Sequence, residues 1–183
     1  MPVDIGSEAI NRATRSGPGY TILDANKLAA VAGVIETIEV WAESNIAACY
    51  VGTFEKLNGN VFKCRDSALL PNVVAGAKRT FTEDWESNPL AIAVEIGDYL
   101  GVYYISGYIE RDSAGAGYWL YFGQAIEPGV QTEYTFTASR TISVGGYISL
   151  LGWTGKISGV TNPAKIMGVA VGSIHSVKGI EAS

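Results

Sequence analysis

Residues 90–109 read LAIAVEIGDYLGVYYISGYI, and this stretch decides the fold class of the chain. Residues 90–96 alternate aliphatic side chains with small or acidic ones, which is typical of a strand that packs one face on a core. Gly97 and Asp98 interrupt the run with turn chemistry. Residues 99–105 are apolar on both alternating faces, so we expect this second strand to lie deep in a sheet. The stretch is long enough for a membrane helix, but two acidic residues and the Gly-Asp break favour strands.

The composition agrees with a turn-rich all-β domain. The 183 residues include 22 Gly and 10 Tyr, and this length suffices for one domain with its own core. The net charge is −5, and the 13 Lys and Arg are scattered, whereas nucleic-acid-binding proteins concentrate basic residues on one face. We therefore expect no direct contact with nucleic acid.

No signal peptide is recognisable at the start of the chain, because residues 1–17 lack an apolar segment. We therefore expect synthesis and assembly in a cytoplasm, with a processed mature form as the alternative. No transmembrane segment is expected either.

Between residues 18 and 153 the pattern predicts nine or ten short strands and no helix longer than ten residues. Residues 24–33 are ambiguous between a short helix and a loop. Short strands at regular spacing are typical of a sandwich or a barrel, and an antiparallel, jelly-roll-like β-sandwich is the preferred fold. Residues 1–17 are predicted to form an N-terminal arm, extended against their own domain or a neighbour, and residues 154–183 a C-terminal repeat extension.

Asn58 and Gly59 give the strongest hairpin signal in the chain. If these two residues form the turn, Cys64 lies opposite Thr53. Cys49 and Cys64 then share one face, roughly 13 Å apart at the usual strand rise. That separation is too long for a disulfide, so both cysteines are predicted to be reduced and buried.

The extension contains three copies of one short motif: a polar residue, Ile or Val, any residue, Gly, and then Val or Ile. The copies begin at Lys156, Lys165 and Ser176. Each has too little apolar area to fold alone. We expect the copies to bind another chain, with folding back as edge strands of the same sandwich as the alternative. The predicted interaction residues are Ile157, Val160, Ile166, Val169, Val177 and Ile180.

No residue pattern indicates catalysis, and the chain is predicted to be non-enzymatic, without cofactor or metal. His175 is the single histidine, and no Asp lies near it in sequence. Two Cys and one His do not give zinc-ligand spacing. The acidic residues Glu83, Asp84 and Glu86 are typical of a solvated loop, with calcium binding as the alternative.

Aromatic side chains offer the alternative to a purely structural role. Trp41, Trp85 and Trp119 are predicted to form a stacking platform for sugars if they are exposed, or to lie in an interface or a core if they are not. The alternative function is therefore a carbohydrate-binding or adhesive module.

Three segments carry a resemblance to a known class: GYTILDANKLAAVAGVIETIEVWAESNIAACYVGTF (19–54), VEIGDYLGVYY (94–104) and KIMGVAVGSIHSVKGI (165–180). In this order of strand, loop, hairpin, V-x-x-G-D-Y strand and Gly-Val repeats, the chain resembles the small β-rich structural proteins of tailed-bacteriophage virions and prophages. The resemblance implies a virion component, either a head decoration (cement) protein or a tail or baseplate module. It also implies homo-oligomers and contacts with other virion structural proteins. No functional residue is carried over.

Overall fold

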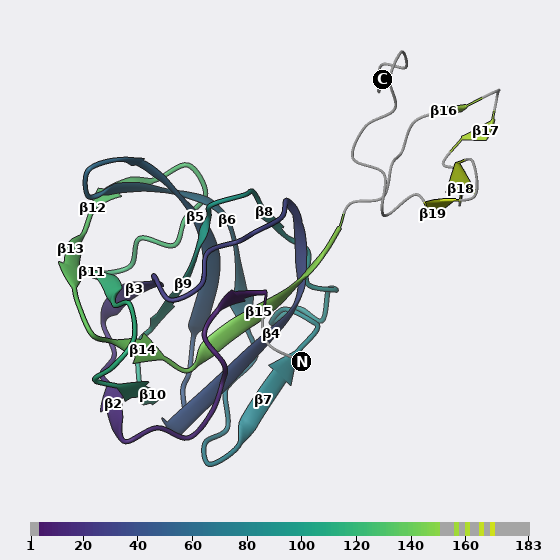
Figure 1. Cartoon of the computed structure of the whole chain (residues 1–183). Coiled ribbons are helices and arrows are strands. Elements are labelled where there is room, and N and C mark those ends of the chain that lie inside the picture. The colour runs from purple at the N-terminus through teal and green to yellow at the C-terminus, as the bar shows by residue number, and fades with distance from the viewer. Residues whose placement is uncertain (1–3, 151–155, 158–159, 162–164, 167–168, 171–183) are drawn as a thin grey trace. The chain divides into compact units, whose positions relative to one another are not determined.

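The computed structural model describes residues 4–150 continuously and, beyond them, the backbone of residues 156–157, 160–161, 165–166 and 169–170. The chain divides into two units, Met1–Ser149 and Leu150–Ser183, called here the body and the extension. The described residues contain no helix, and all pairings between the described strands are antiparallel (Figure 1). The predicted all-β antiparallel class is confirmed.

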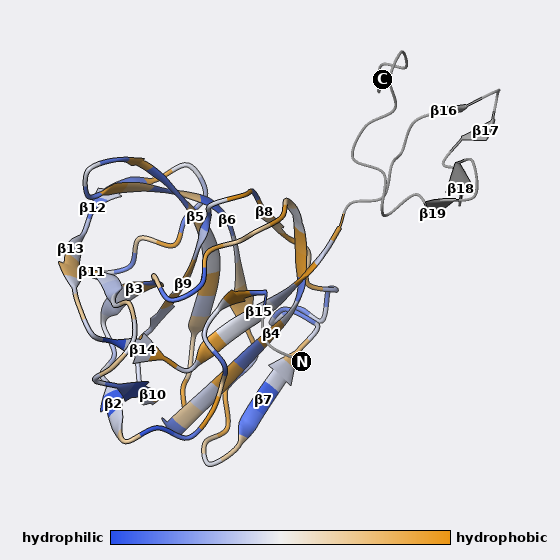
Figure 2. Ribbon diagram, in the orientation of Figure 1, coloured by the Kyte–Doolittle hydropathy of each residue, from blue (hydrophilic) through white to orange (hydrophobic). Residues whose placement is uncertain are grey.

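The first sheet of the body holds eight strands, and the longest of them is β4. Its main order is β1 (Ile5–Gly6), β15 (Val144–Ser149), β4 (Gly33–Ser44), β10 (Tyr108–Asp112) and β14 (Thr141–Ile142). Three further strands extend it: β2 (Thr14–Ser16) pairs with β10, and β7 (Lys78–Phe81) and β8 (Ile92–Val94) pair with β4. Polar and apolar bands alternate along β4 (Figure 2), as expected for a strand with one face on a core.

The second sheet holds seven strands and curls almost into a barrel. Its order is β12 (Gln131–Glu133), β6 (Val61–Leu70), β5 (Cys49–Asn58), β9 (Tyr99–Tyr104), β3 (Tyr20–Asp24), β11 (Tyr118–Phe122) and β13 (Thr135–Thr137). Only Tyr134 separates β12 from β13, although these strands occupy opposite edges of the sheet. One continuous segment therefore pairs with both edges and draws them together (Figure 1).

Two apolar cores result, one on each face of the curled sheet. The larger core lies between the two sheets and takes buried side chains from both, including Ile38, Val40, Val51, Val102 and Ile109. The smaller core fills the inside of the curl, and its buried members are Leu23, Phe54, Phe62, Cys64, Tyr99, Ala125, Ile126 and Tyr134. The central strands of the curled sheet thus contribute to both.

The stretch 90–109 behaves largely as predicted. Leu90, Ile92 and Val94 are buried, and β9 is buried on both faces. The first strand ends earlier than expected, however, and Ile96 is 72% exposed. The chain turns after Val94, where the buried Asp98 carboxylate accepts a hydrogen bond from the Glu95 backbone N–H (2.9 Å).

The β5–β6 hairpin turns one position later than predicted. Asn58 pairs with Val61, so the two loop residues are Gly59 and Asn60, and Gly59 adopts a positive φ of 49°. A glycine accepts this left-handed conformation without steric cost. The prediction that Asn58 and Gly59 form the turn is therefore wrong.

A β-bulge next to the turn places the two cysteines on opposite faces of the sheet. Asn58 pairs with Val61 and Lys56 with Phe62, so Leu57 is left without a partner and the register shifts by one residue. Cys64 pairs with Phe54 rather than with Thr53, and a slip of one residue moves a side chain to the other face. Cys64 therefore lies inside the curl, whereas Cys49 lies between the sheets. Both are free and fully buried, which confirms their predicted burial, and burial raises the pKa of each thiol to about 12.

The N-terminal segment lies against its own domain, which was one of the two predicted alternatives. β1 pairs with β15 and β2 with β10, and Ile5 is fully buried. The Gly6 N–H donates to the carbonyl of Lys27 (2.8 Å), which lies in the segment that was ambiguous between helix and loop. That segment, between β3 and β4, is a loop.

Gly101 in β9 gives a direct test of the packing inside the curl. A Cβ atom at this position would lie 2.4 Å from a ring carbon of Phe54 and 2.7 Å from a methyl carbon of Leu23. We expect Gly101→Ala to lower the free energy of unfolding by about 1–3 kcal/mol, the usual cost of overpacking. Urea unfolding monitored by fluorescence measures it.

Gly17→Ala is the matched control, because its Cβ would meet only a Tyr108 ring carbon at 3.8 Å. An equal loss of stability in the two variants would contradict the packing described for the curl.

Candidate functional site

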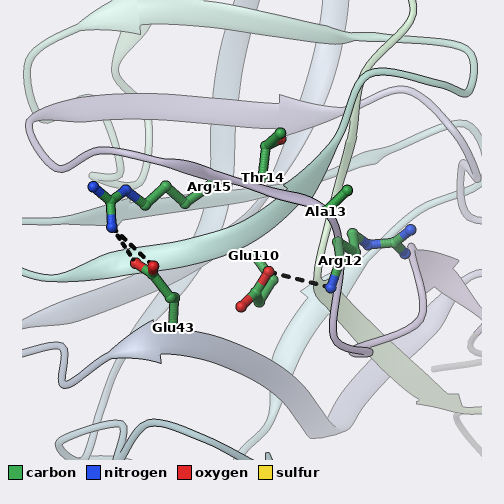
Figure 3. Close-up of a pocket in the computed structure, with 6 residues that line it drawn as sticks. All are labelled: Arg12, Ala13, Thr14, Arg15, Glu43 and Glu110. Atoms are coloured by element: carbon green, nitrogen blue, oxygen red, sulfur yellow. Dashed lines mark hydrogen bonds and ion pairs between the residues drawn. The ribbon is translucent and has the colours of Figure 1, made fainter.

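A polar hollow lies between the N-terminal segment and the eight-stranded sheet. Its volume is about 360 Å³. The N-terminal segment supplies one wall, and β4 and β10 supply the rest (Figure 3). The residues that line it are Arg12, Ala13, Thr14, Arg15, Glu43 and Glu110.

Both guanidinium groups beside this hollow are bonded to protein acceptors. Arg15 donates twice to the Glu43 carboxylate, at 2.8 and 2.9 Å. Arg12 donates through Nη1 to Asp112 (2.8 Å) and through Nε to the Ser143 hydroxyl (2.7 Å). The hydrogen bond from Arg12 holds the pKa of the Asp112 carboxyl below its usual range. Such paired charges serve to fasten the N-terminal segment to the body.

Glu110, which also lines the hollow, holds the N-terminal segment through its carboxylate. Its side chain is buried, and its carboxylate accepts a hydrogen bond from the backbone N–H of Arg12 (3.2 Å), as Figure 3 shows. The Ala13 N–H donates in the same way to Asp112 (3.1 Å). Carboxylates of β10 thus bind backbone groups that no strand pairing satisfies, which keeps the segment before β2 in place.

A second polar cluster surrounds Asp24 at the end of β3. Asp24 is 1% exposed, and one carboxylate oxygen accepts from the Asn26 backbone N–H (2.7 Å) and side-chain amide (2.5 Å). Asn26 in turn bonds to the carbonyl of Arg140 (3.0 Å) and to the N–H of Ala116 (2.6 Å). Burial raises the pKa of the Asp24 carboxyl, because a charged group loses its hydration there.

The three tryptophans proposed as a platform lie in three different places. Trp41 is half-buried on β4, and Trp119 on β11 packs against Phe62 and Phe136, with ring centroids 5.0 and 4.9 Å apart. Trp85, in the loop between β7 and β8, is 57% exposed. None of these three described rings contacts another, so they do not form one platform.

The Trp85 loop is ordered by its own acidic residue. The Asp84 carboxylate accepts from the backbone N–H groups of Glu86 (2.8 Å) and Asn88 (2.9 Å). The hydrogen bond from Asn88 lowers the pKa of the Asp84 carboxyl. The backbone N–H of Trp85 donates to the carbonyl of Leu69 in β6 (2.8 Å), so the loop is tied to the curled sheet while the Trp85 side chain stays exposed.

The predicted interaction residues fall partly within the described backbone. Ile157 pairs with Val160 between β16 (Lys156–Ile157) and β17 (Val160–Thr161). Ile166 pairs with Val169 between β18 (Lys165–Ile166) and β19 (Val169–Ala170). Val177, Ile180 and His175 lie outside the described residues.

Comparison of the chain with protein-family models, with curated proteins and with solved structures gave no match. In the part of the chain that the structure describes, no group of three or more His, Cys, Asp or Glu side chains is placed to hold a metal ion. No helix in that part is long and apolar enough to cross a membrane.

Two polar networks were not predicted from the sequence: the contacts that fasten Arg12 and Ala13 to β10, and the cluster around Asp24. Arg12 bonds to Asp112 at a separation of 100 residues along the chain, and no local pattern indicates such a partner. A weak signal exists in Asp24-Ala25-Asn26, where an Asp followed two residues later by Asn is typical of a side-chain-bonded turn.

The raised pKa of Asp24 predicts a pH-dependent contribution to stability. The folded state keeps the Asp24 proton at pH values where the unfolded chain, with an ordinary pKa of about 4, has lost it. The free energy of unfolding therefore falls as pH rises through this window. Asp24→Asn keeps an oxygen acceptor for Asn26 and removes the titration, so its stability relative to the wild type should rise with pH across the window.

Urea unfolding at a series of pH values measures the effect. Asp84→Asn is the control of opposite sign, because the lowered pKa of Asp84 gives a stabilisation that is lost as pH falls. A difference between wild type and Asp24→Asn that stays constant with pH would contradict the assignment.

Proposed function

We propose that this chain is a non-enzymatic structural protein that assembles, through its extension, with further copies of itself and with other structural proteins. The observation that carries the proposal is the division of the chain into two unlike units. The body, Met1–Ser149, contains both cores and every described strand longer than two residues. The described strands of the extension, in contrast, are two residues long.

Short isolated hairpins are unstable in water unless another surface covers them. The repeats contribute branched aliphatic residues that a neighbouring chain would cover: Ile157, Val160, Ile166, Val169, Val177 and Ile180. Each such side chain contributes about 1.5–3 kcal/mol on burial, less the cost of ordering the segment. An extension that stays attached to a stable body and binds a neighbour is a common way to build an assembly.

The class of assembly that we propose is the virion of a tailed bacteriophage, put together in the host cytoplasm. The support is the resemblance of residues 19–54, 94–104 and 165–180 to small virion structural proteins. Decoration of the capsid and a place in the tail are both part of the proposal. A jelly-roll-like sandwich is the fold expected of such a protein, and two packed antiparallel sheets agree with it.

A carbohydrate-binding or adhesive module is the second candidate, and one observation favours it: the exposed indole of Trp85. Aromatic faces stack on sugar rings, and a single exposed ring on an ordered loop is enough for a weak site. Binding to a glycan array that is lost in Trp85→Ala would support this candidate.

The assembly role is tested by replacing four repeat residues in the full chain: Ile157→Ser, Val160→Ser, Ile166→Ser and Val169→Ser. We expect the wild type to form a discrete oligomer and the variant to dissociate, with a dissociation constant raised by at least about a hundredfold. Light scattering after size exclusion and sedimentation equilibrium measure it. Ser158→Ala with Thr161→Ala, which changes one residue of the first repeat and the residue that follows it, is the control. An unchanged mass for the fourfold variant would overturn the proposal.

A further inference from the structure

The outer edge of β6 leaves part of the curled sheet without a neighbouring strand. β12 pairs with β6 only between Val61 and Lys63, and from Asp66 to Leu70 no described strand pairs with that edge. The loop that carries Trp85 lies along this edge, held by the hydrogen bond from the backbone N–H of Trp85 to the Leu69 carbonyl.

Two adjoining hollows lie between this edge and the loop, with volumes of about 190 and 140 Å³. Asp84 lines both, so they form one surface, called here the edge groove. Its lining residues are Asp66, Ser67, Ala68, Leu69, Asp84, Trp85, Glu86, Pro89, Leu90, Ala91 and Ile92.

The edge groove combines negative charge with an apolar ring. Asp66, Asp84 and Glu86 line it, and Glu83 precedes them in the loop. None of these four carboxylates takes part in an ion pair with a described Lys or Arg. Asp84 remains charged to lower pH than an ordinary carboxyl, because its pKa is lowered. Trp85, which lies between Asp84 and Glu86 in sequence, is exposed and also lines the groove.

The extension has the opposite character. The body carries 10 Lys and Arg against 17 Asp and Glu, a net charge of −7, whereas residues 150–183 carry three Lys against one Glu, a net charge of +2. In the first two repeats a Lys directly precedes the Ile: Lys156-Ile157 and Lys165-Ile166. Each of these two repeats therefore has one Lys next to a branched aliphatic residue in sequence.

From this complementarity we propose that the edge groove binds the repeats of another copy of the chain. Lys156 and Lys165 of one copy pair with Glu83 and Glu86 of the next, and the aliphatic residues of the repeat cover the Trp85 indole. Charge pairs at the rim of an interface select the partner and its register, while the apolar contact supplies most of the affinity. This inference rests on the proposed assembly function and names its acceptor surface.

Charge exchange in the full chain tests the groove. Glu83→Lys with Glu86→Lys makes these two positions of the groove positive. Lys156→Glu with Lys165→Glu makes the matching positions of the repeats negative. We expect each pair alone to raise the dissociation constant of the oligomer about tenfold or more at low salt, and the four changes together to restore assembly. Sedimentation equilibrium at low and high salt is the measurement. Glu95→Lys with Glu127→Lys, two exposed acidic residues outside the groove, is the control with the same change in net charge.

The outcomes separate this inference from the proposed function. Suppose that the fourfold Ser variant dissociates, whereas charge reversal in the groove and Trp85→Ala both leave the mass of the oligomer unchanged. The proposed binding of the repeats to the groove is then overturned, and the assembly role stands. If the fourfold Ser variant also keeps its mass, both are overturned. Loss of glycan binding in Trp85→Ala with intact assembly would assign the indole to a carbohydrate and likewise overturn the groove. Dissociation in Trp85→Ala together with rescue by charge exchange supports it.

Discussion

Burial of β9 on both of its faces is the constraint on which the rest of the body depends. One face directs Leu100, Val102 and Tyr104 into the core between the sheets. The other directs Tyr99 into the curl, where Phe54 occupies the space above Gly101. A strand without a solvent face must have a neighbour on each side and a layer on each face. β5 and β3 are the neighbours, the eight-stranded sheet is one layer, and the closed curl supplies the other.

Closure of the curl follows from this requirement. The inner core needs a wall opposite β9, and the segment from β12 to β13 provides it by pairing with both edges of the sheet. Tyr134, fully buried at the junction, packs its ring against Phe54 and Phe62 at centroid distances of 6.2 and 5.4 Å. The two cores share strands and form one body.

The sequence predicted what depends on local periodicity. Alternation placed the buried face of β8 correctly, and the apolar run 99–105 indicated the doubly buried strand, which ends at Tyr104 and leaves Ile105 exposed. What it missed depends on contacts between distant residues. The predicted register of the β5–β6 hairpin put Cys64 on the wrong face, because a β-bulge between Lys56 and Asn58 shifts the register by one residue and no sequence pattern indicated it. The bond between Arg12 and Asp112, and the closure at Tyr134, have no counterpart in any local pattern.

Native-state hydrogen exchange of the β9 amides tests the central claim most directly. If both cores depend on β9, the amides of Leu100, Val102 and Tyr104 exchange only through global unfolding, with the free energy measured by urea denaturation. Amides of the short strands β2 and β14 should exchange through smaller openings. Exchange of the β9 amides at a free energy well below the global value, or as early as that of β2, would contradict the account.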